Sequence, residues 1–523
     1  MALLVGPMAA GAAGPAAPHA SAHGRTITPG PTASISAVPP PPATPPAPLP
    51  NPVHVALRVT KTRVSRPVPS GFVGFSFEFR AVKEYAGTNP KSINPVLVQL
   101  IRNVAPRQAP VLRIGGNSTD NSWWPLPKVA QPPGVTYTLN KTWLAVTRAL
   151  AADAGARLIV GVNLKLDSPA EAAAELKAYK KGIGARYIDA LEIGNEPELY
   201  KVFPWYFDET GPIYGRPSTY NFADYTHEVA KLAKRLRGFA LAGPTTGAKS
   251  WLAHLSQLFA AVPRLKVVTY HTYPLLACFS VPGDPRYPSI PNLLTLDSSR
   301  HLLDGISPYI ALAHKHGAAF RVDELNSVAC KGTTGVSDAF ASALWVLDSL
   351  FAMLRSGVDG VNIHTLPQAV YAPFSFHRVH GKWVGAVSPE YYGLLLFARA
   401  APPGSRLLNI AQSPSADVRS RATISPGGLM HVVLINDGLT SGHIVTIRPP
   451  KGSGTAVLER LRAPSVASTT GVTLAGQSFG TLTSTGRLAG KVKSVRIKLV
   501  HGRYLIRLPA SSAALLTFAP AAS

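Results

Sequence analysis

Residues 190–197 read Ala-Leu-Glu-Ile-Gly-Asn-Glu-Pro, a short apolar run that ends in an amide and a carboxylate. A run of this length followed by a turn signal is typical of a buried strand. A second run, residues 320–324, reads Phe-Arg-Val-Asp-Glu and also ends in an acid. The segments around these two stretches therefore decide both the fold and the position of its reactive side chains.

Short apolar segments alternate with helix-like stretches between residues 68 and 396. Buried parallel strands are apolar almost throughout, so this alternation predicts a parallel sheet covered by helices. Eight such units favour an α/β fold, a (β/α)8 TIM barrel, over these residues. An open doubly wound sheet is the alternative, but it would need a glycine-rich phosphate turn after its first strand. The predicted strands are 72–79, 111–115, 157–163, 190–194, 240–243, 267–271, 320–324 and 358–364.

The pattern changes after residue 397. Short strands separated by Gly, Ser and Pro replace the helical periodicity, which predicts an antiparallel β-sandwich domain over 397–523. The segment 53–67 is a further strand, which we expect to join that sandwich. The strands predicted in the sandwich are 432–435, 444–447, 457–461, 495–500, 504–508 and 514–518.

The amino-terminal residues predict export. Residues 1–22 resemble a secretory signal that ends in Ala20-Ser21-Ala22, although a basic start is missing. The first 52 residues hold 14 of the 49 prolines, so 23–52 is expected to be a disordered linker. This predicts a secreted, extracellular or periplasmic protein.

Composition narrows the partners. The chain has 523 residues and a net charge of +25, with 46% apolar residues, which excludes a wholly disordered protein. No uninterrupted apolar run is long enough for a transmembrane segment. No zinc-finger, helix-turn-helix or basic-aromatic motif occurs, so nucleic acid is not an expected partner. Attraction to an acidic polysaccharide stays open.

Two cysteines, Cys278 and Cys330, are too few for a disulfide scaffold or a four-cysteine zinc site. Two unrelated buried thiols are one possibility. However, the cysteines follow the sixth and seventh predicted strands, which are neighbours in a barrel, so both fall on adjacent loops. In an exported protein this predicts a disulfide between them.

Barrel enzymes carry their reactive groups at the carboxyl ends of the strands. Glu196 follows the fourth predicted strand and Glu324 ends the seventh. A lone glutamate is usually solvated or paired in a salt bridge, but an acid at the apolar end of a buried strand needs a partner. Two such carboxylates match the pair that glycoside hydrolysis requires.

The same stretches resemble glycoside hydrolase family 79, the family of β-glucuronidases and heparanase. The resemblance extends from about residue 72 to the C-terminus and is typical of a secreted, bacterial-type member. The motifs that carry it are Leu-Arg-Ile-Gly-Gly-Asn-Ser at 112–118, Leu-Glu-Ile-Gly-Asn-Glu-Pro-Glu at 191–198, Asp-Glu-Leu-Asn-Ser at 323–327, Gly-Val-Ser at 335–337 and Phe-Ala-Ser-Ala-Leu-Trp at 340–345.

The resemblance implies a retaining mechanism. Glu324 would be the nucleophile, and Glu196 would be the general acid and then the general base. The two carboxyl groups should then lie roughly 5–5.5 Å apart. Glu196 must be protonated at the start of the cycle, so a raised pKa is expected. Asn195 would bind the sugar 2-hydroxyl.

Other polar residues follow the predicted strands and are candidates for substrate binding. Members of the family hold a uronic acid carboxylate with tyrosines and with backbone N–H groups after the nucleophile, so Tyr371 and the loop 327–335 are the candidates here. We expect neither a metal nor a cofactor. The further candidates are Glu78, Asn117, Asn163, Lys165, Tyr270, His271, Tyr273 and His364.

The resulting hypothesis is a secreted retaining exo-β-glucuronidase that acts on glycans or glycosides. One alternative is an endo-acting, heparanase-like hydrolase of acidic polysaccharide. Another is a β-glycosidase for a neutral sugar on the same barrel, since fold does not determine substrate. A carbohydrate-binding protein without catalysis is the alternative outside the enzymes.

Overall fold

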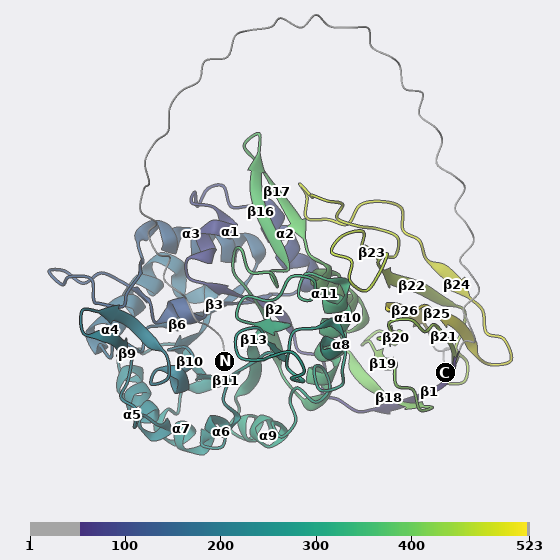
Figure 1. Cartoon of the computed structure of the whole chain (residues 1–523), viewed down its shortest axis with the longest axis horizontal. Coiled ribbons are helices and arrows are strands. Elements are labelled where there is room, and N and C mark those ends of the chain that lie inside the picture. Colours follow the sequence, from purple (N-terminus) through teal and green to yellow (C-terminus); the bar gives the residue numbers. More distant parts are fainter. Residues whose placement is uncertain (1–52, 520–523) are drawn as a thin grey trace, which may run out of the picture.

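The computed structural model describes residues 53–519, so the expected signal segment 1–22 and the linker 23–52 lie outside the described residues. Eight parallel strands form a closed barrel, in which each strand pairs with the next in chain order and the last pairs with the first (Figure 1). The predicted barrel is thus confirmed, and each predicted strand overlaps an observed one. The barrel strands are β2 (Val73–Glu78), β3 (Val111–Gly115), β6 (Arg157–Val162), β7 (Ile188–Ile193), β10 (Ala240–Thr246), β11 (Leu265–Thr272), β13 (Ala319–Leu325) and β15 (Gly360–Thr365).

Helices surround the barrel, and local signals define their ends. In α3, the Asn140 side chain accepts a hydrogen bond from the Trp143 amide, and Gly155 ends the helix in the left-handed region. In α5, Asn221 and Asp224 form a capping box. The helices are α1 (Ala81–Ala86), α2 (Pro95–Val104), α3 (Lys141–Ala154), α4 (Pro169–Tyr179), α5 (Phe222–Ala233), α6 (Lys249–Leu252), α7 (Leu255–Ala261), α8 (Ile290–Leu293), α9 (Ser307–Lys315), α10 (Phe340–Ser356) and α11 (Pro389–Ala400).

The C-terminal domain is a ten-stranded, mostly antiparallel sheet. Strand β1, which precedes the barrel, lies inside this sheet and pairs with β18 antiparallel and with β21 parallel. Strands β18 and β19 were not among the predicted strands. The sheet strands are β1 (Val53–Arg63), β18 (Arg406–Gln412), β19 (Val418–Ile424), β20 (Met430–Asn436), β21 (His443–Arg448), β22 (Ala456–Arg462), β23 (Thr473–Leu474), β24 (Val495–Ile497), β25 (Tyr504–Leu508) and β26 (Ser512–Phe518).

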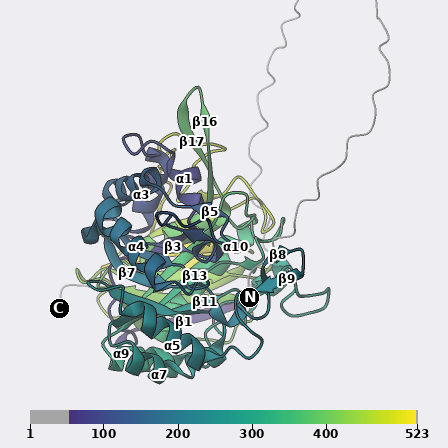
Figure 2. The same ribbon diagram turned by 90° about the vertical axis from the view of Figure 1, so that its left-hand side faces the viewer.

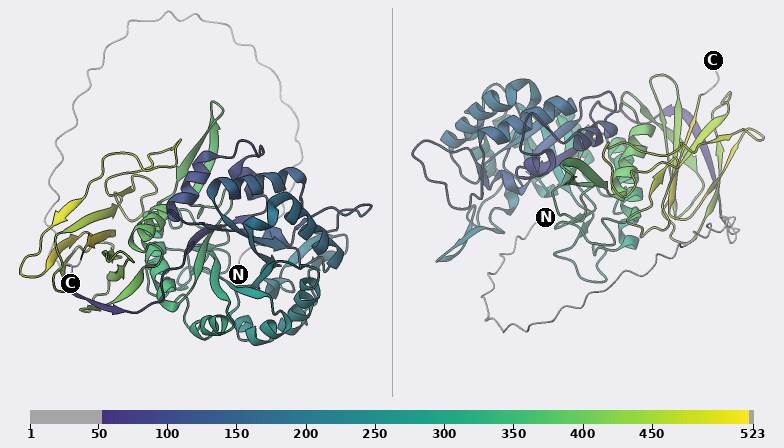
Figure 3. Two further views of the ribbon diagram at one scale, coloured as in Figure 1. Left: turned by 180° about the vertical axis from the view of Figure 1, so that it is seen from behind. Right: turned by 90° about the horizontal axis from the view of Figure 1, so that it is seen from above.

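The sheet packs against the side of the barrel, with α10 and α11 between them (Figures 1 and 3). Strand β20 explains why the two parts adhere. Its residues Val432 and Leu434 lie in the core of the sheet domain, whereas Val433 and Ile435 belong to the core that includes the barrel helices. Side chains alternate along a strand, so a strand that is apolar on both faces joins two cores.

Loops at the carboxyl ends of the barrel strands carry short strand pairs (Figure 2). One pair joins the loop after β11 to the loop after β13. Among residues 53–519, no helix has the length and apolar character that crossing a bilayer requires. The short strands are β4 (Ser122–Trp123), β5 (Tyr137–Thr138), β8 (Pro204–Asp208), β9 (Gly211–Tyr214), β12 (Leu275–Leu276), β14 (Val328–Ala329), β16 (Phe374–Val379) and β17 (Lys382–Val387).

Candidate active site

The barrel brings Glu196 and Glu324 together. A carboxylate oxygen of each and a ring nitrogen of His271 all lie within 4.8 Å of one another. Both carboxylates are buried, with exposed fractions of 2% for Glu196 and 3% for Glu324. Glu196 follows β7, Glu324 lies in β13, and His271 lies in β11, so three nearby strand ends supply the three groups.

Glu196 has an unusual backbone. Its φ of 45° and ψ of 57° lie in the left-handed region, which residues other than glycine seldom adopt. Its N–H donates to the Thr245 carbonyl at 2.8 Å, and Pro197 starts a 3-10 helix at the next position (η4, Pro197–Leu199). Strained residues concentrate at functional sites, where the surrounding structure maintains them.

Arg113 of β3 lies in a fully buried position beneath the carboxylates. Its Nη1 donates to Glu324 Oε2 at 2.7 Å, its Nε donates to Glu192 Oε2 at 2.7 Å, and its Nη2 donates to Asn195 Oδ1 at 2.8 Å. The Nε also lies 3.2 Å from Asp323. The planar guanidinium therefore sets the positions of Glu324 and Asn195 relative to each other.

Glu324 is held as a carboxylate. Burial raises its pKa, but the nearby His364, His271 and Arg113 and a hydrogen bond from Tyr273 hold the pKa well below the ordinary range. The Tyr273 hydroxyl donates to Oε1 at 2.8 Å. The ionised form is the one that a nucleophile needs.

His271 controls the ionisation of Glu196. Burial lowers the pKa of His271, but the charges of Glu324 and Asp323 and the hydrogen bond to Glu196 raise it to about 9. Its Nδ1 lies 3.2 Å from Glu196 Oε1. Burial raises the pKa of Glu196, whereas the hydrogen bond and the charge of His271 lower it. The expected raised pKa of Glu196 stays a prediction.

An amide chain leads from Arg113 towards Glu78. Asn195 Nδ2 donates to Asn117 Oδ1 at 2.9 Å, and the Asn117 backbone N–H donates to Glu78 at 3.2 Å. Gly116 is required between them, because its φ is +78° and a Cβ there would lie 2.6 Å from a Glu78 oxygen. Glu78 also lies 3.8 Å from His364.

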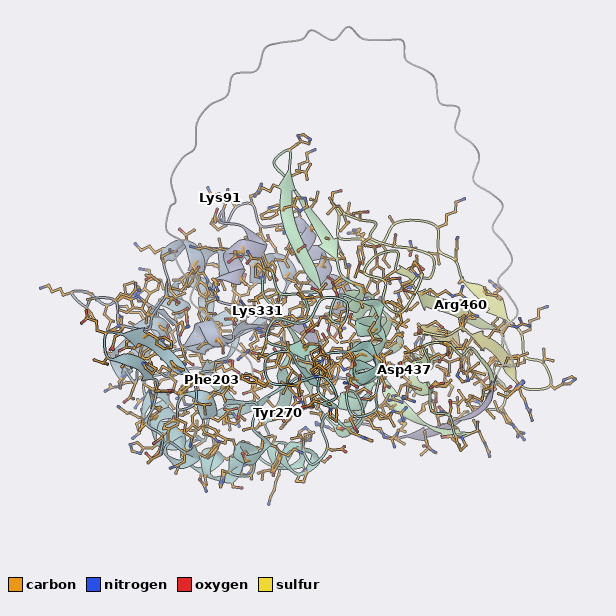
Figure 4. All side chains as sticks on the ribbon, viewed as in Figure 1. Lys91, Phe203, Tyr270, Lys331, Asp437 and Arg460 are labelled. Atoms are coloured by element: carbon orange, nitrogen blue, oxygen red, sulfur yellow. A yellow bond between two sulfur atoms is a disulfide. The ribbon has the colours of Figure 1, made fainter. Side chains whose placement is uncertain are left out.

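A cavity of about 140 Å³ adjoins this network, and its walls include Glu78, Asn117 and Tyr371. The Tyr371 ring lies 6.1 Å from the His364 ring and 6.3 Å from the Tyr273 ring. Arg80 and Lys331 also contribute to the walls, and Lys331 is labelled in Figure 4.

Three candidates from the sequence lie elsewhere or have other contacts. Tyr270 belongs to the large hydrophobic core cluster, whereas its neighbour His271 contacts the carboxylates. Asn163 donates to the Ser122 carbonyl at 2.8 Å and accepts from the Leu166 amide, so it supports a turn. Lys165 stacks over the ring of Tyr200 at 4.7 Å, and burial lowers its pKa although the charges of nearby acids, including Glu196, oppose this.

Cys278 and Cys330 form a disulfide with a Cα–Cα distance of 6.1 Å, which confirms the predicted bridge. The bridge ties the loop after β11 to the loop after β13, beside Lys331. It therefore fixes the loop that follows Glu324.

The donors of Glu196, His271 and Glu324 converge closely enough to hold a cation. Both Glu324 oxygens already accept hydrogen bonds, one from Arg113 and one from Tyr273. A metal ion there would also face the guanidinium and the protonated imidazole, and like charges disfavour this. The arrangement fits a hydrogen-bonded carboxylate pair better than a metal centre.

Sequence reasoning did not single out Arg113, Glu192 or Asp323 as functional. Burial and the charge of Glu192 raise the pKa of Asp323 well above its ordinary range, although Arg113 and His271 oppose this. A signal for them was present in the sequence, because charged residues inside predicted buried strands must neutralise one another.

Comparison with known proteins gives matches along the chain. The model of the glycosyl hydrolase family 79 C-terminal beta domain matches residues 408–515. A β-glucuronidase from Aspergillus niger is 23% identical over 516 residues, which cover 86% of this chain and 91% of that protein. A β-glucuronidase from Neurospora crassa is 22% identical over 391 residues, or 67% of each chain.

Solved structures share the fold. A 4-O-α-L-rhamnosyl-β-D-glucuronidase from Fusarium oxysporum superposes with a TM-score of 0.69 at 18% identity, over 88% of this chain and 100% of that one. A family 51 arabinofuranosidase from Xanthomonas axonopodis gives 0.64 at 14% identity, over 89% and 99%. The sheet-domain match, the full-length relatives and the strand-end motifs together support the resemblance of this chain to glycoside hydrolase family 79.

Proposed function

We propose that this glycoside hydrolase is a secreted, retaining exo-β-glucuronidase, which removes terminal glucuronic acid from a glycan or glycoside. The observation that carries the proposal is the pair of buried carboxylates, Glu196 and Glu324, with oxygens within 4.8 Å of each other. Retaining enzymes separate their carboxyl groups by about 5–5.5 Å, and inverting enzymes by about 6.5–9.5 Å. Two β-glucuronidases among the relatives support the choice of sugar.

In the first step, an oxygen of Glu324 bonds to the anomeric carbon while the bond to the leaving oxygen breaks. Glu196 gives its proton to that oxygen, so the aglycone leaves as a neutral alcohol. In the second step, Glu196 removes a proton from water, and the resulting oxygen displaces Glu324 from the anomeric carbon. The low pKa of Glu324 supports its role, because the nucleophile must be ionised.

The proton for the first step comes from the pair formed by His271 and Glu196. In the unliganded site this proton lies on the imidazole, 3.2 Å from the carboxylate. A bound sugar excludes water, and this favours the neutral pair of Glu196 and His271 over the ion pair. Transfer of the proton from His271 to Glu196 across this hydrogen bond therefore forms the general acid when substrate is bound.

Asn195 is the proposed partner of the sugar 2-hydroxyl. Its Oδ1 accepts from Arg113 and its Nδ2 donates to Asn117, so the amide orientation is fixed. The second N–H on Nδ2 is then directed by these contacts and can donate to the sugar. A hydrogen bond from a donor that is already oriented becomes stronger as charge develops in the transition state.

The cavity lined by Glu78 and Tyr371 supports the choice of an acidic sugar as the substrate. Its walls include Tyr371, Arg80 and Lys331. A buried carboxylate needs hydrogen-bond donors or positive charge, and a hydroxymethyl group does not. Export is supported by the signal-like residues 1–22 and by the disulfide, because disulfides persist in oxidising compartments.

The test is a panel of 4-nitrophenyl glycosides that differ only in the sugar: β-glucuronide, β-glucoside, β-xyloside and α-arabinofuranoside. We expect the glucuronide to exceed the glucoside by at least roughly 10²–10³ in kcat/KM, the scale of two lost charge-assisted hydrogen bonds. Equal rates on the glucuronide and the glucoside would favour the neutral-sugar alternative. No turnover by a folded protein would favour a binding protein. Product lengths from an acidic oligosaccharide separate exo from endo action.

A further inference from the structure

A second cavity, of about 740 Å³, lies between the barrel and the C-terminal sheet. Its walls come from the end of α10, from β18 and β19, and from the segment before α9, and these elements can be followed in Figure 1. None of its lining residues belongs to the carboxylate site. Three arginines line it: Arg300, Arg355 and Arg421.

Positive charge exceeds negative charge in this cleft. Asp348 is one acid that faces the arginines, and it forms an ion pair with Arg421. Arg300 Nε lies 3.8 Å from the second oxygen of Asp348, which is too far for a hydrogen bond. Within residues 53–519, Arg355 has no carboxylate at ion-pair distance. Asp437 also acts on Arg300, but it forms its own ion pair with Arg419, so positive charge remains in excess.

The donors in the cleft are incompletely used. The Nε–H groups of Arg300 and Arg421 are buried and have no acceptor among the described residues. Burial and the charge of Arg421 lower the pKa of Arg300 to about 10, although Asp348 raises it. Buried donors without acceptors are rare, so the charge and hydrogen-bonding capacity of these arginines are not fully used within the described residues.

Neutral polar groups complete the walls, including Ser307, Ser356 and Gln412. Hydroxyl and amide groups beside cations suit a ligand that carries hydroxyls and negative charge together. We propose that this cleft is a second carbohydrate site, which binds an acidic oligosaccharide through its carboxylates. The choice of a sugar acid rests on the proposed function, whereas the anionic character of the ligand rests on the arginines alone.

The test measures binding of tetragalacturonate, an α-linked uronic acid chain that a β-glucuronidase does not cleave. Isothermal calorimetry compares the natural chain with a double variant, Arg300→Gln with Arg355→Gln. The matched control, Arg496→Gln with Arg503→Gln, removes two exposed arginines from β24 and the start of the last hairpin, far from the cleft. Both double variants lose the same net charge.

We expect the cleft variant to bind tetragalacturonate at least about tenfold more weakly and the control within about twofold of the natural chain. Hydrolysis of an aryl glucuronide should change in neither, so failure here is distinguishable from failure of the proposed function. Added salt should weaken binding to the natural chain, because the contacts are ionic.

Equal affinity of the cleft variant and the natural chain would overturn the proposal. The proposal would also be overturned if neutral cellotetraose or inorganic sulfate alone bound as tightly as tetragalacturonate. The same holds if a single-stranded oligonucleotide bound as tightly and displaced tetragalacturonate. If the double variant fails to fold, the natural chain is treated with phenylglyoxal, which modifies arginines, with and without tetragalacturonate. Protection of Arg300 and Arg355 by tetragalacturonate would then support the site. Unprotected arginines would then contradict the site.

Discussion

Arg113 and Glu324 are joined by a hydrogen bond of 2.7 Å from Nη1 to Oε2, although they come from strands on different sides of the barrel. Arg113 is fully buried and also bonds Glu192 and Asn195. The proposed nucleophile and the proposed 2-hydroxyl partner thus share one planar group. Their spacing is set inside the barrel, beneath the loops.

Replacing Arg113 by lysine should change both rate and pH dependence. Lysine offers a point charge and cannot donate to Glu324, Glu192 and Asn195 together. Because Arg113 lowers the pKa of Glu324, its loss should move the acid limb of kcat/KM to higher pH. We expect kcat/KM to fall at least about tenfold. Arg321→Lys is the control, since Arg321 bonds Asn362 and the Gly71 carbonyl instead. Equal losses in both variants would make the effect one of general stability.

The two glutamates should respond differently to removal. Glu324→Ala should abolish turnover of every substrate, because no covalent intermediate can form. Glu196→Ala should retain far more activity on substrates with good leaving groups, which need no proton. Added azide should restore its rate and give a β-glycosyl azide. Near-normal rates in both variants would refute the assignment of these residues.

His271 should determine the basic limb of the activity profile. The pair of His271 and Glu196 holds a proton that the free site loses with a pKa of about 9. In His271→Gln, Glu196 alone can hold the proton. The basic limb of kcat/KM should therefore move to lower pH, because a carboxylic acid loses its proton at lower pH than the imidazolium. His431→Gln, a change in the C-terminal sheet, should leave the limb in place. An unchanged limb in His271→Gln would exclude the proton pair.

The same histidine predicts a pH dependence of stability. Its folded pKa of about 9 lies above the ordinary 6.5, so its contribution is complete below pH 6.5 and is lost as the pH rises through 9. Urea unfolding should show that the natural chain loses about 3 kcal/mol more than His271→Gln between these pH values. Parallel curves for the two proteins would contradict the raised pKa.

The fold could be predicted because apolar runs and turns carry it. Every barrel strand was found from alternation, whereas β19 was missed because Arg419 and Arg421 interrupt its apolar pattern. Strand ends identified Glu196 and Glu324, but not the orientation of their neighbours. The register of β11 against β13 shifts after Tyr270, so that His271 pairs with Glu324, and no local pattern shows this. Arg113 was missed for the opposite reason: its partners lie on β7 and β13, and only barrel closure brings them together.

Tyr371 should contribute to the choice of sugar. Its buried ring lies against His364 and Tyr273 and lines the cavity with Arg80 and Lys331. Tyr371→Phe should lower the ratio of glucuronide to glucoside kcat/KM by about tenfold, the scale of one hydrogen bond to a charged group. Tyr270→Phe is the matched control, because Tyr270 is a buried tyrosine that does not line this cavity. An equal loss on both sugars would make Tyr371 a general positioning residue.

The disulfide should stabilise the loops on the active face. The bridge closes a span of 52 residues, which corresponds to roughly 4 kcal/mol in the chain-entropy model. The variant Cys278→Ser with Cys330→Ser should lose a comparable free energy of unfolding, measured in urea without reductant. The natural, unreduced chain should give no free thiol on titration. Two free thiols in the native protein would refute the bridge in solution.

Trapping of the covalent intermediate tests the central claim most directly. A 2-deoxy-2-fluoro-β-glucuronyl fluoride forms the glycosyl-enzyme quickly and releases it slowly, because fluorine at C2 slows both steps and fluoride leaves readily. Mass spectrometry of the digested protein should find one sugar on the peptide that contains Glu324, and Glu324→Ala should not be labelled. A label on another residue, or turnover without any covalent adduct, would contradict the account.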